Sequence, residues 1–209
     1  MMDKKPPAGL FRVEHRVTPA DRRAMNGHGG GVLWLTGLSG SGKTTLALAL
    51  EQHLSLKGYQ AYVLDGDNIR GGLNSDLGFS PKDRDENIRR IGEVSALFAE
   101  AGFIAITAFI SPYAKDRRRA RAIDPARFRE VHVNADLETC ERRDPKGLYR
   151  KARQGRITDF TGISAPYEIP ETPDLVIHTG NESVANSVST LLGFVETEFG
   201  AAGSMDRVA

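Results

Sequence analysis

Three features are scarce in this 209-residue sequence: cysteine, long apolar runs, and an excess of charge of either sign. Cys140 is the single cysteine, which excludes an intrachain disulfide framework and is typical of a reducing compartment. The longest apolar stretch, GFIAITAFI, is too short to span a bilayer. The N-terminal residues MMDKKPPAGL also lack the apolar core of a signal peptide. We therefore expect a cytoplasmic protein with no membrane partner.

The balance of charge also excludes some kinds of partner. The net charge is +1 at pH 7, with 40% hydrophobic and 26% charged residues. A near-neutral chain gives no bulk electrostatic reason to bind nucleic acid. The basic segment KDRRRARA (115–122) is more often the solvated face of a helix than a nucleic-acid patch. We therefore expect no nucleic-acid partner.

Short apolar runs alternate with longer helical patterns along the chain. Continuous apolar runs are typical of strands covered on both faces, as in a parallel sheet. The alternation predicts an α/β fold, a three-layer sandwich around a mostly parallel five-stranded sheet. The predicted strands are 32–36, 61–65, 103–110, 130–135 and 174–179, and the predicted helices are 43–57, 82–101, 114–123, 137–153 and 183–199.

The two ends of the chain differ from this pattern. Residues 1–31 combine mixed charge with NGHGGG, which predicts a flexible N-terminal extension leading into the first strand. Residues 201–209 predict a flexible tail. The length between them, 32–200, fits one domain with a core of its own and a mobile lid at about 143–170.

The segment GLSGSGKTT follows the first predicted strand and opens the first predicted helix. It matches the phosphate-loop (P-loop) pattern GxxxxGK[ST], in which glycines let backbone N–H groups turn toward an anion at a helix N-terminus. Lys43 would reach the β- and γ-phosphates, and the Thr44 hydroxyl would ligate Mg²⁺. The alternative is a glycine-rich turn that binds nothing, but the flanking strand and helix favour a nucleotide site. Its predicted residues are Gly37, Leu38, Ser39, Gly40, Ser41, Gly42, Lys43, Thr44 and Thr45.

Two carboxylates, Asp65 and Asp67, end the second predicted strand. They stand at the sheet edge where ligands bind in open α/β folds. There they can hold Mg²⁺ or accept a proton from an attacking hydroxyl. The alternative is an aspartate-rich turn that caps the next helix. Arg70 follows within two turns and adds a fixed positive charge beside the acids.

The helix predicted at 82–101 carries polar residues on its buried stripe. Its apolar positions recur every three or four residues, and the stripe continued backward meets Asn87 and Arg84. An inward-facing charge needs a partner, which an anionic substrate would supply. The alternative is a structural pair of Arg84 with Asp65 or Asp85.

Ser111 stands just before Pro112, which ends the strand predicted at 103–110. Its hydroxyl has three open roles: nucleophile, hydrogen-bond partner of a phosphate, or turn residue. No histidine lies next to it in the sequence to activate it, which favours the turn.

The segment RDPKGLYRKARQGR (143–156) carries six basic residues and one acidic residue. Such residues neutralise a moving phosphoryl group when a lid closes over it. Phe79 and Phe160 lie in polar loops, where their rings either stack on a purine or plug small satellite cores.

Taken together, these segments resemble the adenylylsulfate (APS) kinase family over nearly the whole chain. The resemblance rests on GLSGSGKTT, LDGDNIR, LNSDLGFSPKDRDENIRRIGEV, FISPY, RDPKGLYRKAR and DFTGI. It implies a P-loop kinase that transfers the γ-phosphoryl of ATP to the 3′-hydroxyl of adenosine 5′-phosphosulfate, in sulfate assimilation. The product would be 3′-phosphoadenosine 5′-phosphosulfate.

The resemblance also implies roles for single residues. Asp65 would orient or deprotonate the hydroxyl, and Asp67 would lie near a Mg²⁺ that Thr44 also ligates. Phe79 and Phe160 would sandwich the acceptor adenine, and Lys146 would belong to the closing lid. Ser111 matches the family serine assigned as a phosphorylated intermediate, although direct in-line transfer needs only positioning and charge stabilisation. Arg70, Arg84 and Asn87 would hold the phosphosulfate.

Other classes of function stay open at this point. A nucleotide-dependent switch needs no second anion site, and the guanine-reading N-K-x-D motif of GTPases is absent from the sequence. Within the kinases, another nucleoside, a sugar acid or an antibiotic hydroxyl is an alternative acceptor. We also expect a homodimer, and association with an ATP sulfurylase, which would make the acceptor, is a further possibility.

Overall fold

The computed structural model describes residues 13–200, so the predicted tail and the first part of the predicted extension lie outside it. Its centre is a five-stranded sheet in the order β2-β3-β1-β4-β5, in which every strand pair is parallel. The predicted parallel sheet is therefore confirmed. The strands are β1 (Gly31–Thr36), β2 (Ala61–Asp65), β3 (Ile104–Ala108), β4 (Phe128–Asn134) and β5 (Leu175–His178).

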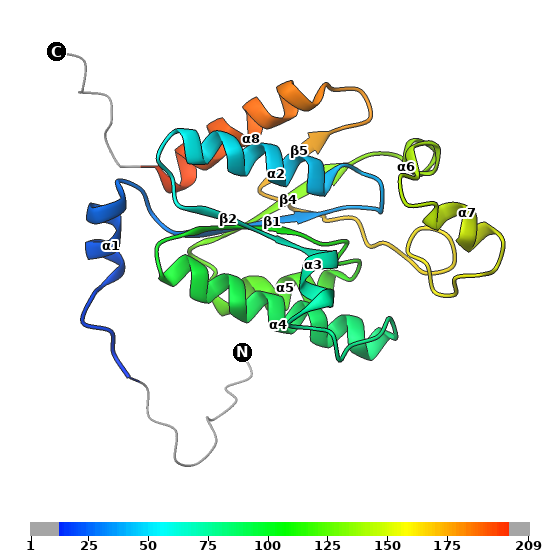
Figure 1. Ribbon diagram of the computed structural model, residues 1–209, viewed down its shortest axis with the longest axis horizontal. Coiled ribbons are helices and arrows are strands. Elements are labelled where there is room, and N and C mark those ends of the chain that lie inside the picture. Colours follow the sequence, from blue (N-terminus) through cyan, green and yellow to red (C-terminus); the bar gives the residue numbers. More distant parts are fainter. Residues whose placement is uncertain (1–12, 201–209) are drawn as a thin grey trace.

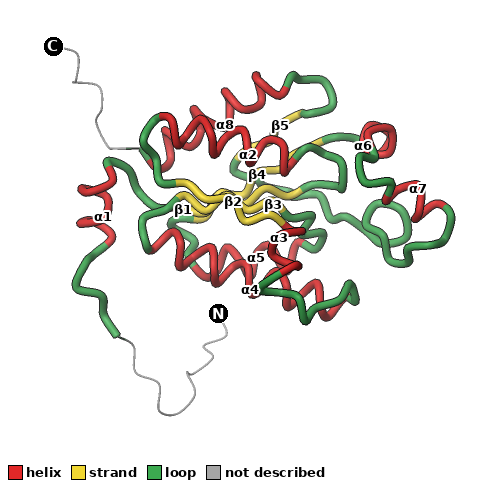
Figure 2. Tube along the Cα trace, viewed as in Figure 1, coloured by secondary structure: helices red, strands yellow, loops and turns green. Residues whose placement is uncertain are grey.

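Helices cover both faces of this sheet, as Figures 1 and 2 show. The helices α2 (Lys43–Leu56) and α8 (Val184–Phe199) lie on one face, and α4 (Pro81–Glu100) and α5 (Ala114–Ile123) lie on the other. The predicted three-layer sandwich is confirmed. No helix within residues 13–200 has both the length and the hydropathy needed to cross a membrane.

The central strand β1 shows why its sequence lacks alternation. Leu33 and Leu35 pack into the core under α2 and α8, while Val32 and Trp34 pack into the core under α4. Because the strand is buried on both faces, all six of its residues are apolar or small enough to be enclosed.

The helix predicted at 137–153 is wrong as a single element. It is two short helices, α6 (Leu137–Arg143) and α7 (Leu148–Arg153). Pro145 has no N–H to donate and disfavours helical backbone before it. Gly147 then takes a left-handed conformation with φ of 65° just before α7. The break turns α7 away from α6, and both lie beyond one end of the sheet (Figure 1).

Two helices were not predicted: α1 (Pro19–Asn26) and α3 (Gly66–Gly71). Thr18 and Asp21 form a capping box at the start of α1, with Pro19 in the first turn. After α1, the backbone N–H of Gly29 donates to the carbonyl of Phe199 over 2.7 Å. Residues 19–26 are thus helical and Gly29 is bonded to the end of α8, while the flexibility of the N-terminal extension stays a prediction.

Candidate active site

The carboxyl ends of the parallel strands meet around a cavity of about 1330 Å³. This is where ligands bind in open α/β sheets. The cavity brings together most of the side chains that the sequence singled out, including Arg84 and Asn87 on the same side as Lys43. The predicted residues that line it are Ser39, Gly40, Gly42, Lys43, Thr44, Thr45, Asp65, Asp67, Arg70, Phe79, Arg84, Asn87, Ser111, Lys146 and Phe160.

The phosphate loop takes a left-handed conformation that favours glycine at two positions. Gly40 has φ of 75° and Gly42 has φ of 98°. A Cβ on Gly40 would also lie 2.9 Å from the carbonyl oxygen of Cys140. The remaining predicted loop residues, Gly37, Leu38 and Ser41, belong to the same turn but do not line the cavity.

Two residues that the sequence reasoning missed hold this loop from outside. The Tyr149 hydroxyl donates to the carbonyl of Ser39 over 2.9 Å, and the Thr179 hydroxyl donates to the carbonyl of Ser41 over 2.7 Å. Both come from distant segments, α7 and the end of β5, so spacing along the chain gave no signal for them.

The ammonium of Lys43 is turned onto its own loop. Its Nζ donates to the carbonyl of Gly37 over 2.9 Å and to that of Leu38 over 2.7 Å. Burial disfavours the charged form and lowers the pKa of Lys43 to about 8. The ammonium of Lys43 is therefore held by carbonyl oxygens of the loop itself.

The side-chain oxygens of Thr44 and Asp65 meet at the start of α2. The Thr44 hydroxyl donates to Asp65 Oδ2 over 2.8 Å, and Asp65 Oδ1 accepts from the backbone N–H of Asp67 over 3.0 Å. Asp65 thus caps α3, so the capping alternative holds alongside a place in the cavity. The carboxylate of Asp67 forms an ion pair with Lys146 of the basic segment.

Arg84 faces the cavity from the first turn of α4. Its guanidinium donates to the Thr161 hydroxyl over 2.9 Å and to the carbonyls of Phe79 and Asp159. Within the described residues Arg84 pairs with neither Asp65 nor Asp85: Asp65 accepts from Thr44 and Asp67, and Asp85 is bound by Arg119. All three partners of Arg84 are neutral oxygens, so its positive charge is available to an anion.

The two phenylalanines differ in their surroundings. Phe79 is 67% exposed, and the Arg70 guanidinium lies 4.5 Å from its ring centroid. Phe160 is 8% exposed and packs edge-on against Tyr149 in a satellite core beside α6 and α7. Phe160 therefore fits both alternatives, since it belongs to the satellite core and also lines the cavity.

Ser111 is enclosed and has an uncommon backbone conformation. Its φ is 40°, its side chain is buried, and its Oγ accepts from Trp34 Nε1 over 3.1 Å. Arg117 holds its carbonyl over 2.8 Å. A non-glycine residue at positive φ beside a cavity is held by its surroundings.

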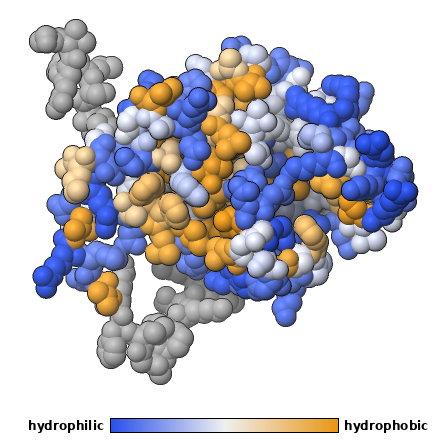
Figure 3. All heavy atoms as spheres, in the orientation of Figure 1, coloured by the Kyte–Doolittle hydropathy of each residue, from blue (hydrophilic) through white to orange (hydrophobic). Residues whose placement is uncertain are grey.

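The surface around the basic segment 143–156 is hydrophilic. Hydrophilic residues dominate the part of the surface over α6 and α7 in Figure 3. Arg143, which was not singled out, lines the cavity and donates to the carbonyls of Gly40 and Thr179. On α5, by contrast, the buried Arg117 pairs with Glu130 over 2.6 Å, so part of the KDRRRARA segment has a structural role.

The phosphate loop shares one cavity with a second group of cationic side chains, Arg70, Arg84 and Lys146. This arrangement is typical of the class of P-loop kinases. Comparison with known proteins names the family. The sequence profile of the adenylylsulphate kinase family matches residues 29–178. The chain therefore belongs to that family, and the kinase activity predicted from the sequence, adenylyl-sulfate kinase activity with ATP, is confirmed.

Relatives and solved structures agree with this assignment. The adenylyl-sulfate kinase of Geotalea daltonii is 60% identical over 86% of this chain and 89% of its own length. That of Staphylococcus epidermidis is 52% identical over 88% of this chain and 92% of its own length. The APS kinase of Mycobacterium tuberculosis, solved in complex with AMPPNP and APS, superimposes with a TM-score of 0.77 and 48% identity, over 80% of this chain and 98% of its own.

Proposed function

We propose that the cavity holds ATP over the phosphate loop and adenosine 5′-phosphosulfate between α3, α4 and the basic segment. The observation that carries this proposal is that Lys43, Asp65 and Arg84 line one cavity. The loop supplies backbone donors for a polyphosphate. Arg84 and Asn87 supply donors for a second anion, which a nucleotide switch would not need.

In this arrangement Asp65 accepts the proton of the acceptor 3′-hydroxyl as its oxygen attacks the γ-phosphorus of ATP. The bond from that phosphorus to the β–γ bridging oxygen breaks, and ADP leaves with the electron pair. Catalysis is then positioning plus charge stabilisation, as in other phosphoryl transfers. Lys43 and Lys146, which both line the cavity, neutralise charge on the transferred group. Release of Lys146 from Asp67 would accompany closure of the lid at 143–170.

The donor set near Thr44 fits Mg²⁺. Hydroxyl and carboxylate oxygens are the ligands this ion prefers, and it commonly takes one or two from protein and the rest from phosphates and water. Thr44 would hold it with a carboxylate of the β2 end. Asp65 is the carboxylate in direct contact with Thr44, and Asp67 follows two residues later in the first turn of α3. When bound, the ion neutralises charge on the β- and γ-phosphates.

For Ser111 we propose a contact with substrate rather than a phosphoserine intermediate. Its Oγ lies against the Trp34 indole, and within the described residues no carboxylate or imidazole hydrogen-bonds to it. A serine nucleophile needs such a base to be activated. Direct transfer between two bound substrates does not use it.

Phe79 and Arg70 would bind the acceptor from one side, with the exposed ring stacking on its adenine. Phe160 belongs to the satellite core and also lines the cavity. It would therefore contact the same adenine only through the small part of its ring that the core leaves exposed. Stacking on an aromatic ring is worth about 1–3 kcal/mol per base.

Product formation from a panel of acceptors tests the proposed acceptor. The purified chain is incubated with ATP, Mg²⁺ and either adenosine 5′-phosphosulfate, AMP, gluconate or shikimate, and products are separated by ion-exchange chromatography. We expect 3′-phosphoadenosine 5′-phosphosulfate in the first reaction only. Equal turnover of AMP would contradict recognition of the phosphosulfate by Arg84 and Asn87.

The remaining partner predictions are also proposals. We propose a cytoplasmic homodimer, supported by exposed apolar side chains such as Tyr62 on edge strand β2 and Leu97 on α4. A related APS kinase from Thiobacillus denitrificans, 35% identical, is hexameric. Light scattering during size-exclusion chromatography measures the assembly. Co-purification with an ATP sulfurylase tests that association.

A further inference from the structure

The loop between α3 and α4 carries part of the proposed acceptor site. Asn74 is fully buried, and its Nδ2 donates to Asn87 Oδ1 over 2.9 Å. Because this bond occupies the oxygen of the Asn87 amide, its NH₂ group is left for the cavity that Asn87 lines. Phe79 ends the same loop. The position of the loop therefore sets both the amide and the ring that face the acceptor.

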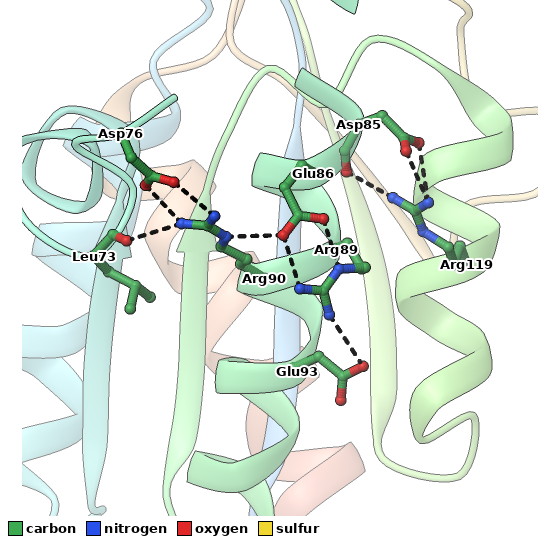
Figure 4. Close-up of polar contacts among 8 residues, drawn as sticks. All are labelled: Leu73, Asp76, Asp85, Glu86, Arg89, Arg90, Glu93 and Arg119. Carbon is green, nitrogen blue, oxygen red and sulfur yellow. Dashed lines mark hydrogen bonds and ion pairs between the residues drawn. The ribbon is translucent and has the colours of Figure 1, made fainter. Parts of the chain in front are cut away.

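Besides the Asn74–Asn87 bond and the bond from Arg84 to the carbonyl of Phe79, a charged side chain of α4 holds this loop. The two terminal nitrogens of Arg90 each donate to one oxygen of Asp76, over 2.7 and 2.8 Å, and one of them also reaches the carbonyl of Leu73 over 3.3 Å (Figure 4). The Nε of Arg90 donates to Glu86 over 2.9 Å, which fixes the guanidinium from behind. Arg90 stands one turn after Asn87, so the same helix carries the anion-facing amide and the anchor of the loop.

The charges of this cluster persist over the working pH range. Hydrogen bonds from Arg89 and Arg90 lower the pKa of Glu86 to about 2, and the bond from Arg90 also lowers the pKa of Asp76. The ion pair is nonetheless partly solvated, with side-chain exposures of 27% for Arg90 and 59% for Asp76. Such pairs add little to global stability. Their two-point geometry instead fixes orientation.

We propose that Arg90 is a positioning residue that clamps the 72–79 loop to α4 and thereby sets affinity for the acceptor but not for ATP. The proposal rests on the placement of the acceptor in the α3–α4 half of the cavity. Arg90 itself does not line that cavity and acts through Asp76, Asn74 and Phe79.

Arg90→Met and Arg89→Met form a matched pair of variants. Arg89 is the neighbouring arginine on the same helix, and it binds Glu86 and approaches Glu93 without touching the loop (Figure 4). We expect Arg90→Met to raise the KM for the acceptor about tenfold while the KM for ATP changes less than about twofold, in line with coupling through a bidentate contact. Arg89→Met should change neither value. Arg90→Lys, which keeps the charge without the fork, should fall between wild type and Arg90→Met.

A double-mutant cycle locates the effect in the contact. Asp76→Ala should raise the acceptor KM by about the same factor as Arg90→Met, and the double variant should be no worse than either, because residues in direct contact are not additive. If the factors by which the two single variants raise the acceptor KM multiply in the double variant, Arg90 does not act through Asp76. That result would overturn the proposal.

Amide hydrogen exchange tests the clamp independently of catalysis. In the free protein, residues 72–79 should exchange faster in Arg90→Met than in Arg89→Met, while α2 and the phosphate loop remain as in wild type. Equal exchange of the loop in Arg90→Met and Arg89→Met would overturn the proposal. So would an equal rise of the acceptor KM and the ATP KM in Arg90→Met. Failure of the wild-type chain to phosphorylate the acceptor would count against the proposed function, and exchange would still decide on the clamp.

Discussion

The Thr44 hydroxyl donates a 2.8 Å hydrogen bond to the carboxylate of Asp65. This bond links the first turn of α2, which follows the phosphate loop, to the end of β2. One residue belongs to the nucleotide half of the cavity and the other to the proposed site of proton transfer. The contact places these two halves next to each other, as transfer between two bound substrates requires.

Replacing Asp65 should stop transfer and leave ATP binding nearly unchanged. We expect Asp65→Asn to lower kcat about 10²–10⁴-fold, the usual range for loss of a general base. The amide oxygen of Asn can still accept from the N–H of Asp67, so α3 should remain capped, while its NH₂ can donate to the Thr44 hydroxyl in place of accepting from it. Direct detection of the product and ATP titration by calorimetry measure the two properties. Full turnover in this variant would refute the role of Asp65 in proton transfer.

Activity should depend on the protonation of Lys43. Its pKa is lowered to about 8 in the free protein, so the side chain is cationic below that pH and becomes neutral as the pH rises through it. A neutral amine attracts phosphates weakly, and kcat/KM for ATP should therefore fall above pH 8, approaching about tenfold per pH unit, as for one essential proton of the free enzyme. Initial rates from pH 6.5 to 9.5 at low ATP measure this profile. A flat profile would show that the cation keeps its proton.

Phe79 should matter for the acceptor and hardly at all for folding. Because its ring is mostly exposed, Phe79→Ala should shift the midpoint of thermal unfolding little, yet raise the acceptor KM about 5- to 150-fold, as expected for loss of one stacked base. Leu73→Ala is the matched control, because Leu73 is a half-exposed apolar residue on the same loop. An equal change in both variants would mean that stacking is not the cause.

Arg117 should be important for stability. It is buried, pairs with the Glu130 carboxylate, which is 12% exposed, and donates to the carbonyls of Ser111 and Glu168. Arg117→Met leaves a buried carboxylate without its main partner and should cost about 3–5 kcal/mol of unfolding free energy. Urea denaturation measures this value. Arg118→Met, at the exposed next position, should stay within about 0.5 kcal/mol of wild type.

Much of the fold was predictable from the sequence because buried strands and an amphipathic helix leave strong local patterns. The apolar run of β1 and the stripe through Ile88 and Ile91 are examples, and both gave the correct element. The capping box at Thr18 also marked α1, but the polar composition around it favoured a flexible segment. Pro145 and Gly147 marked the break between α6 and α7, which was missed because apolar and basic residues continue on both sides.

The site was predictable where its residues belong to one motif or one helix face. The phosphate loop follows from spacing, and Asn87 follows from the 100° repeat of α4. Contacts between distant segments left no such signal. Tyr149 and Thr179 hold the phosphate loop from elements more than 100 residues downstream, and the environment of Phe160 depends on how α7 folds back.

The carbonyls that hold Lys43 have a consequence for nucleotide selection. A ligand must replace two short hydrogen bonds of the resting loop, and a chain of phosphates long enough to reach the buried ammonium can do so. A monophosphate that stops short of it leaves those bonds in place and gains only the backbone donors. We therefore expect the loop to bind a triphosphate more tightly than a monophosphate.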